Sequence, residues 1–141
     1  MKGFSKPIGE TLSFTRGAET LEITFYPLPM GYRVWLQSAF PLPVKFVNGK
    51  AADADPGAVN EWNDLATLLM IARAAAPGTF DTELPPAGSD ASFYRARAER
   101  IRQEIREANL TDGDVRAMWA VVNRLSTAST ADSRLRAAEG N

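Results

Sequence analysis

The 141-residue sequence contains no cysteine and no histidine. Without cysteine the chain can form no disulfide, offers no thiolate nucleophile and builds no zinc site on sulfur. Without histidine it lacks the commonest general base, the serine–histidine triad and the usual ligand of haem and zinc. We therefore expect a non-enzymatic protein, with no catalytic residue, no cofactor and no metal ion.

An excess of one charge is also missing. Lys plus Arg number 16 and Asp plus Glu number 17, which gives a formal net charge of -1. Surfaces that bind nucleic acid normally need a basic excess, so this balance disfavours a general nucleic-acid binder. No apolar run approaches the roughly 20 residues of a membrane-spanning helix. Residues 1–7 carry two lysines with no apolar core behind them, so we expect no secretory signal.

Two segments near the N-terminus, 11–15 and 21–25, alternate polar and apolar residues as half-buried strands do. The connection between them, residues 16–19, contains Gly17, which can adopt positive φ in a turn. We therefore predict a β-hairpin over residues 11–26. Its buried face would carry Leu12, Phe14, Leu21, Ile23 and Phe25.

Four later segments repeat apolar residues every three or four positions, which is the pattern of an amphipathic helix. Asp55-Pro56 and Ser89-Asp90 are typical helix starts, and Thr111 with Asp114 approximates a capping box. The second of the four segments has the widest apolar face, so we expect it to be the central helix. The predicted helices cover about 30–40, 56–75, 90–108 and 112–126.

The predicted fold class is α+β, with the N-terminal β-hairpin packed on a bundle of three to four α-helices. Residues 44–47 are expected to form a brief strand or extended segment ending at the turn signal Asn48-Gly49, followed by a surface loop over 49–55. Residues 77–89, with three prolines and two glycines, are expected to form a long loop. One globular domain would span 11–127, between a flexible arm at 1–10 and a flexible tail at 128–141.

Two charged clusters allow a functional and a structural interpretation. Asp53 and Asp55 alternate in a loop that is weakly typical of calcium sites, but no later glutamate completes an EF-hand pattern. A solvated loop with a helix cap is therefore favoured. Five arginines between residues 95 and 106, Arg97 among them, could bind phosphate. The interleaved acidic residues favour instead a solvated helix face or the rim of a protein interface.

Aromatic residues are the remaining candidates. Trp35, Trp62 and Trp119 fall on the apolar stripes of three different predicted helices, where core packing is favoured and partner contact is the alternative. The segment 25–32 is dense in aromatic residues and prolines. A strand-to-helix corner is favoured there over a peptide-docking surface.

This corner carries a resemblance. The run Phe25-Tyr26-Pro27-Leu28-Pro29-Met30-Gly31, followed by the amphipathic residues 32–36, resembles the opening of tail assembly chaperones of long-tailed bacteriophages. In that family an N-terminal strand leads through a P-L-x-x-G corner into helices. Residues 110–126 resemble the closing helix of the same family. The resemblance covers about residues 10–40 and 58–127, and the proline-rich stretch 77–89 departs from it.

The resemblance implies a non-enzymatic protein of the host bacterial cytoplasm that binds the tape-measure protein and assists assembly of the tail tube. No catalytic residue transfers, because the family has none. Under this interpretation the protein presents apolar surface to a helical segment of tape-measure or tail tube proteins, and it can form a homo-oligomer. The candidate partner contacts are Tyr26, Leu28, Met30, Tyr32 and Trp35.

Two other functions stay open at this point. One is a structural or adaptor subunit of the virion, in the tail or the capsid. The other is a small regulatory protein that binds nucleic acid through the 95–106 helix.

Overall fold

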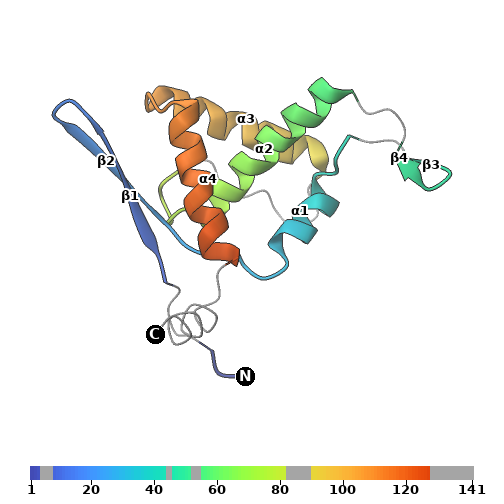
Figure 1. Ribbon diagram of the computed structural model, residues 1–141, viewed down its shortest axis with the longest axis horizontal. Coiled ribbons are helices and arrows are strands. Elements are labelled where there is room, and N and C mark those ends of the chain that lie inside the picture. Colours follow the sequence, from blue (N-terminus) through green and yellow to red (C-terminus); the bar gives the residue numbers. More distant parts are fainter. Residues whose placement is uncertain (4–7, 44–45, 52–54, 82–89, 128–141) are drawn as a thin grey trace, which may run out of the picture.

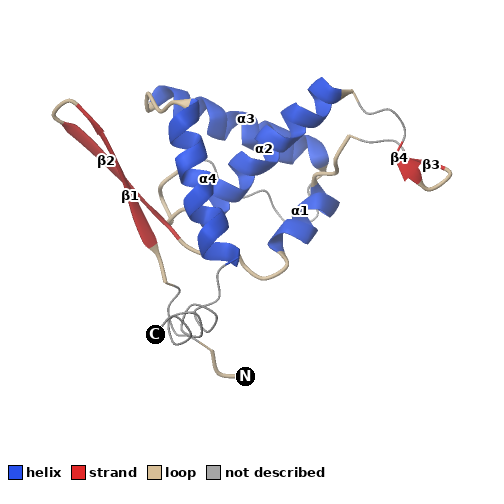
Figure 2. Ribbon diagram, viewed as in Figure 1, coloured by secondary structure: helices blue, strands red, loops and turns tan. Residues whose placement is uncertain are grey.

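The computed structural model describes residues 1–3, 8–43, 46–51, 55–81 and 90–127 (Figure 1). It confirms the α+β class: a two-stranded antiparallel hairpin is followed by four helices in the described part of the chain. The hairpin lies at one side of the helices, and a second, very short hairpin lies at the other (Figure 2). The predicted tail, residues 4–7 of the predicted arm, residues 44–45 of the predicted short strand, Asp53 and residues 82–89 lie outside the described residues. The elements are β1 (Glu10–Arg16), β2 (Glu19–Phe25), α1 (Tyr32–Ala39), β3 (Phe46–Val47), β4 (Lys50–Ala51), α2 (Pro56–Ala74), α3 (Ala91–Glu107) and α4 (Asp112–Thr127).

Both strands of the N-terminal hairpin are longer than predicted, and the turn between them is shorter. All seven residues of β1 pair with β2, from Glu10 opposite Phe25 to Arg16 opposite Glu19, so the turn consists of Gly17 and Ala18 alone. Phe14, Ile23 and Phe25 are buried as predicted. The prediction for Leu21 is wrong, because 41% of this residue is exposed. α4 contacts β1 more extensively than β2, so Phe14 is covered while its cross-strand neighbour Leu21 is not.

Backbone hydrogen bonds attach the end of β2 to the end of α2. The Tyr26 N–H donates to the Ala74 carbonyl at 2.8 Å, and the Ala76 N–H donates to the Thr24 carbonyl at 2.9 Å. Phe25, which lies between these two bonds and bridges to Ala75, is completely buried. The hairpin is therefore joined to the bundle by main-chain pairing around one large apolar anchor.

Local capping signals set the starts of the long helices. The Asp55 carboxylate accepts the Gly57 N–H at 3.1 Å and Pro56 is the first residue of α2, as predicted. At the start of α4 the Thr111 hydroxyl accepts the Asp114 N–H at 3.2 Å, and the Asp114 carboxylate accepts the Thr111 N–H at 2.9 Å. This confirms the capping box, which satisfies two helix-end donors reciprocally. Asp90 caps α3 through the N–H groups of Ser92 and Phe93.

α2 is the central helix, as predicted. It packs against both α3 and α4 and buries six side chains. The facing stripes of α3 and α4 complete the core with Ile101, Met118 and Val122, all of which are inaccessible to solvent. None of the helices in the described residues is both long and apolar enough to cross a membrane. The buried residues of α2 are Leu65, Ala66, Leu68, Leu69, Ile71 and Ala74.

One expected loop is partly a strand. Phe46–Val47 pairs with Lys50–Ala51 around Asn48 and Gly49, which have φ of 52° and 76°. Positive φ at both central residues is the geometry that a two-residue hairpin favours and that Asn-Gly tolerates. The turn signal was therefore predicted correctly, but the prediction of a surface loop over all of 49–55 is wrong at residues 50 and 51.

Candidate protein interface

The corner between β2 and α1 is held in place from both sides. The Leu28 N–H donates to the Ser126 hydroxyl at 2.9 Å, and the Tyr32 N–H donates to the Pro29 carbonyl at 3.0 Å. Gly31 caps α1 with φ of 78°, a backbone conformation that glycine adopts without steric cost. Met30, directly before it, is fully exposed. The corner thus presents one large apolar side chain on a backbone fixed by hydrogen bonds and prolines.

The five candidate contacts predicted from the sequence lie in different surroundings. Leu28 is a core residue, with only 9% of its surface exposed, so its side chain offers little to a partner. The half-buried ring of Tyr26 lies against Gly9, where an added Cβ would come within 2.7 Å of the ring. Met30 and Trp35 are exposed, and Tyr32 is half-buried. The structure brings Tyr32 and Trp35 together, with their ring centroids 5.4 Å apart.

The three tryptophans do not share one environment. Trp62 stacks on Phe40 at 5.9 Å between ring centroids, and its indole N–H donates to the Phe40 carbonyl at 2.9 Å. Trp62 and Trp119 pack against the core, which agrees with the favoured interpretation. Trp35 instead contacts Tyr94 of α3 edge-on at 5.7 Å and leaves 47% of its surface exposed. For Trp35 the core prediction is therefore wrong.

Two further exposed apolar residues were not predicted from the sequence. Val34 is 71% exposed on α1, and Phe93 is 58% exposed in the first turn of α3. Phe93 precedes Tyr94, the residue that contacts Trp35, and lies one helical turn before Arg97, whose charge acts on Tyr32. Residues four apart share a helix face, so Phe93 projects on the side of α3 nearest α1. We call Met30, Val34, Trp35 and Phe93 the α1 surface.

Only a weak sequence signal marks these two residues. Val34 and Phe93 are large apolar side chains that fall off the apolar stripes of their helices. A single such residue is common on protein surfaces and needs no explanation. Their meaning depends on α1 and α3 meeting in space, which periodicity within one helix does not reveal.

Two arginines from neighbouring helices, Arg73 of α2 and Arg97 of α3, interact with Tyr32 of α1. The Arg73 guanidinium lies 5.9 Å from the ring centroid of Tyr32. Burial raises the pKa of the Tyr32 hydroxyl, and the positive charges of Arg73 and Arg97 partly oppose that rise. Arg97 is itself buried, and desolvation lowers the pKa of its guanidinium.

The burial of Arg97 corrects the prediction that all five arginines of 95–106 lie on a solvated face. The buried side of α3 is wider than its stripe of Tyr94, Ala98, Ile101 and Ile105, because α1 also covers part of this helix. Arg97 lies on that additional side, where its charge interacts with Tyr32 and Glu104. Other arginines of the group pair with acids: Arg95 lies 3.9 Å from Glu99, and Arg102 lies 3.2 Å from Glu61 of α2.

α1 is also tied to α4. The Arg33 guanidinium lies 5.2 Å from the ring centroid of Trp119 and donates to the Asn123 side-chain oxygen. Together with the Trp35–Tyr94 and Phe40–Trp62 contacts, this places aromatic or cation–π contacts on three neighbouring helices. A helix of only eight residues is not stable alone, so these contacts hold α1 in one orientation.

A concave feature, separate from the α1 surface, lies between α2, α3 and α4. It is an open groove of about 660 Å³ with an apolar floor that includes Ile105, Val115 and Trp119. Its rim is charged but balanced, with three acidic residues and three arginines. Arg102 donates two hydrogen bonds to Glu61, at 3.2 and 3.4 Å, so part of that charge is already paired. Among the described residues no group of three acidic side chains is placed to hold a metal ion.

Comparisons with models of known protein families, with curated proteins and with solved structures found no match to this chain. The geometry of the described residues is therefore the main basis for a functional proposal. Its clearest feature is a set of large apolar side chains exposed on α1, on the corner before it and in the first turn of α3.

Proposed function

We propose that the protein is a non-enzymatic assembly chaperone of a long-tailed bacteriophage, which binds the tape-measure protein through the α1 surface during construction of the tail. The observation that carries the proposal is the exposure of Met30, Val34, Trp35 and Phe93 on a fixed support. Methionine and aromatic residues are enriched in the centres of protein interfaces, and tryptophan is frequently an energetic hot spot. The assignment to tail assembly rests on the resemblance of residues 25–36 and 110–126 to that family.

The shape of the surface favours a helical partner segment. α1 and the first turn of α3 meet where Trp35 packs on Tyr94, so exposed side chains on two short ridges flank a shared aromatic contact. An amphipathic helix recognises such a surface with apolar residues spaced three and four apart. α1 carries Arg33 but no acidic residue, so its charge does not oppose a partner with acidic flanks.

The fixed geometry is also suited to binding. Ordering flexible side chains and loops on association costs free energy, and a surface ordered beforehand avoids part of that cost. The hydrogen bonds at Leu28 and Tyr32 and the Arg33–Trp119 contact supply this order before any partner arrives.

The test is affinity for purified fragments that tile the tape-measure protein of the same phage, measured by calorimetry. The double variant Met30→Ala, Trp35→Ala should bind the recognised fragment at least about tenfold more weakly, as expected for loss of a hot spot. Leu21→Ala is the matched control, because Leu21 is a similarly exposed apolar residue on the hairpin. It should bind like the wild type.

Four outcomes would contradict the proposal. Unchanged affinity in the double variant would exclude the α1 surface as the binding site. Equal weakening by Leu21→Ala would indicate a non-specific effect of removing an exposed apolar side chain. If the protein binds none of the fragments, the proposed chaperone function is wrong. Retention of the protein in purified virions would point instead to a structural subunit, since an assembly chaperone leaves the finished particle.

A further inference from the structure

The outer edge of β1 carries backbone groups that do not pair within the hairpin. A two-residue turn makes its flanking residues, Arg16 and Glu19, a hydrogen-bonded pair, and such pairs alternate along antiparallel strands. Thr15, Ser13 and Thr11 therefore direct their N–H and C=O groups away from β2. The same alternation makes Thr24 point outward on β2, and its carbonyl is indeed the group that accepts the Ala76 N–H.

The two edges of the hairpin differ in the backbone contacts that cover them. The β2 edge is covered at Thr24 by residues 74–76. On the β1 edge, within the described part of the chain, the contact to an outward backbone group is the bond from the Arg16 guanidinium to the Thr15 carbonyl at 3.3 Å. Proteins usually block edge strands with proline, lysine or a bulge. β1, with the sequence E-T-L-S-F-T-R and an unbroken seven-residue register, has none of these.

The sequence of β1 is complementary to itself in the antiparallel direction. One register pairs all seven residues with a second copy, and it is centred on Ser13. It places Thr11 opposite Thr15, Leu12 opposite Phe14 and Glu10 opposite Arg16 of the second copy. Hydroxyl thus meets hydroxyl and apolar meets apolar, which are favourable cross-strand pairs. Glu10 and Arg16 already form ion pairs with Arg124 and Asp114 of α4 within one chain, so the pairing with a second copy does not depend on them. Residues with outward backbone groups also meet each other in this register.

We infer that two copies of this chain pair antiparallel along β1, about a two-fold axis at Ser13, and form a four-stranded sheet in the order β2–β1–β1–β2. A two-fold interface requires one patch to complement itself, which this strand does. Leu12 is only half-buried in the single chain, and Phe14 of the second copy lies beside it in the dimer. This interface is separate from the α1 surface and does not depend on the proposed function.

The decisive variants place proline on opposite edges of the same hairpin. Ser13→Pro removes an outward N–H, which an edge strand tolerates without losing a hairpin hydrogen bond. Glu22→Pro is the matched control, because Glu22 lies directly opposite Ser13 and its N–H also points outward, from β2. The Ser13 hydroxyl donates to the Glu22 carboxylate at 3.4 Å, so both variants lose that bond.

Sedimentation velocity over a range of concentrations measures the outcome. We expect the wild type and Glu22→Pro to form dimers and Ser13→Pro to dimerise at least tenfold more weakly, with circular dichroism showing that all three are folded. A monomeric wild type, or a Ser13→Pro protein that dimerises like the wild type, would overturn the inference. If Ser13→Pro does not fold, the cysteine experiment below decides the question.

The absence of native cysteine makes the register directly testable. In a dimer of Ser13→Cys, the thiols of the two copies lie opposite each other. Their Cα atoms are about 5.5 Å apart, as in any hydrogen-bonded antiparallel pair. A short bifunctional thiol reagent should therefore cross-link Ser13→Cys with itself. It should join Thr11→Cys to Thr15→Cys in mixtures but not Thr11→Cys to itself, where four residues of offset separate the thiols by about 13 Å. Equal cross-linking of Glu22→Cys would contradict the β1 interface.

Discussion

The hairpin and α1 are both short elements attached to the outside of the same bundle, but they use their apolar residues differently. The hairpin inserts Phe14, Ile23 and Phe25 into the core. Within α1 itself Leu36 is the buried residue, while Val34 and Trp35 stay outside. The hairpin thus uses most of its large apolar side chains for folding, whereas α1 keeps some of them at the surface, where they are available to a partner.

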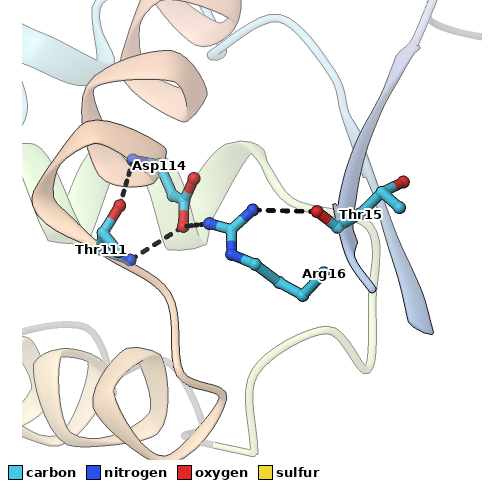
Figure 3. A network of polar contacts seen from close by, with 4 residues as sticks. All are labelled: Thr15, Arg16, Thr111 and Asp114. Carbon is cyan, nitrogen blue, oxygen red and sulfur yellow. Dashed lines mark hydrogen bonds and ion pairs between the residues drawn. The ribbon is translucent and has the colours of Figure 1, made fainter. Parts of the chain in front are cut away.

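The polar and aromatic contacts that link these two elements to the other helices also differ in kind. The hairpin is linked to α4 by the ion pairs Arg16–Asp114 (Figure 3) and Glu10–Arg124, both solvent-accessible. Exposed ion pairs of this kind contribute about 0–1 kcal/mol each, so the buried side chains of the hairpin hold it in place. Besides the burial of Leu36, α1 is held by edge-on and stacked aromatic contacts, a cation–π contact and one indole hydrogen bond.

The largest expected effect comes from the anchor of the hairpin. Phe25→Ala removes a fully buried ring beside the β2–α2 junction and should lower the free energy of unfolding by about 3–5 kcal/mol, measured by urea denaturation. Leu21→Ala, on the same face of the hairpin but exposed, should change it by less than about 0.5 kcal/mol. If the two variants lose similar stability, the contrast between buried and exposed apolar residues within the hairpin is wrong.

An intermediate loss of stability is expected from a change at Trp62, which contacts Phe40 at the end of α1. Trp62→Phe preserves an aromatic ring against Phe40 but removes the donor to the Phe40 carbonyl, which should cost about 1–2 kcal/mol of unfolding free energy. Trp35→Phe makes the same chemical change on the exposed side of α1, and should cost less than Trp62→Phe. The reverse order in thermal or urea denaturation would show that α1 is held from its outer side.

The smallest expected loss of stability concerns the contacts of Asp114 with Thr111 and Arg16, and it depends on pH. The Thr111 N–H, and then the Arg16 guanidinium, hold the pKa of the Asp114 carboxyl below its ordinary value of 3.8. Because the folded pKa is depressed, the stabilisation is present above pH 3.8 and is lost as pH falls through the folded pKa. Asp114→Asn should therefore be less stable than the wild type at pH 7, and the difference should shrink as pH falls below 3.8.

Urea midpoints at several pH values between 7 and 2 measure this convergence. Asp112→Asn is the control, because Asp112 lies in the same first turn of α4 but makes neither the Thr111 nor the Arg16 contact. Convergence of equal size in the control would assign the effect to the helix dipole instead of the network of Figure 3.

Features that depend on neighbouring residues in the chain were predictable. Asp55-Pro56 and the Thr111–Asp114 pair cap their helices because capping needs only residues two or three positions away. The alternation in the hairpin likewise identified both strands. In each case the same short segment supplies the signal and the contacts.

Features that depend on a distant element were not predictable. Leu21 continues the apolar alternation of β2, yet it is exposed because α4 lies nearer the other strand. In the sequence Arg97 belongs to a charged helix face, yet in the structure it is buried because α1 packs near this side of α3. Of the candidate contacts, Met30 and Trp35 are exposed and Leu28 is not, and no periodicity within residues 26–35 distinguishes them.

The positions of the three tryptophans give the molecule its own optical reporters. Trp62 emits from behind α1, Trp119 from beneath Arg33, and Trp35 from the outer side of α1. In single-tryptophan variants, detachment of α1 would change the emission of Trp62 and Trp119, whereas docking of a partner would shift that of Trp35 alone. Fluorescence can thus separate loosening of this helix from occupation of its surface without an added label.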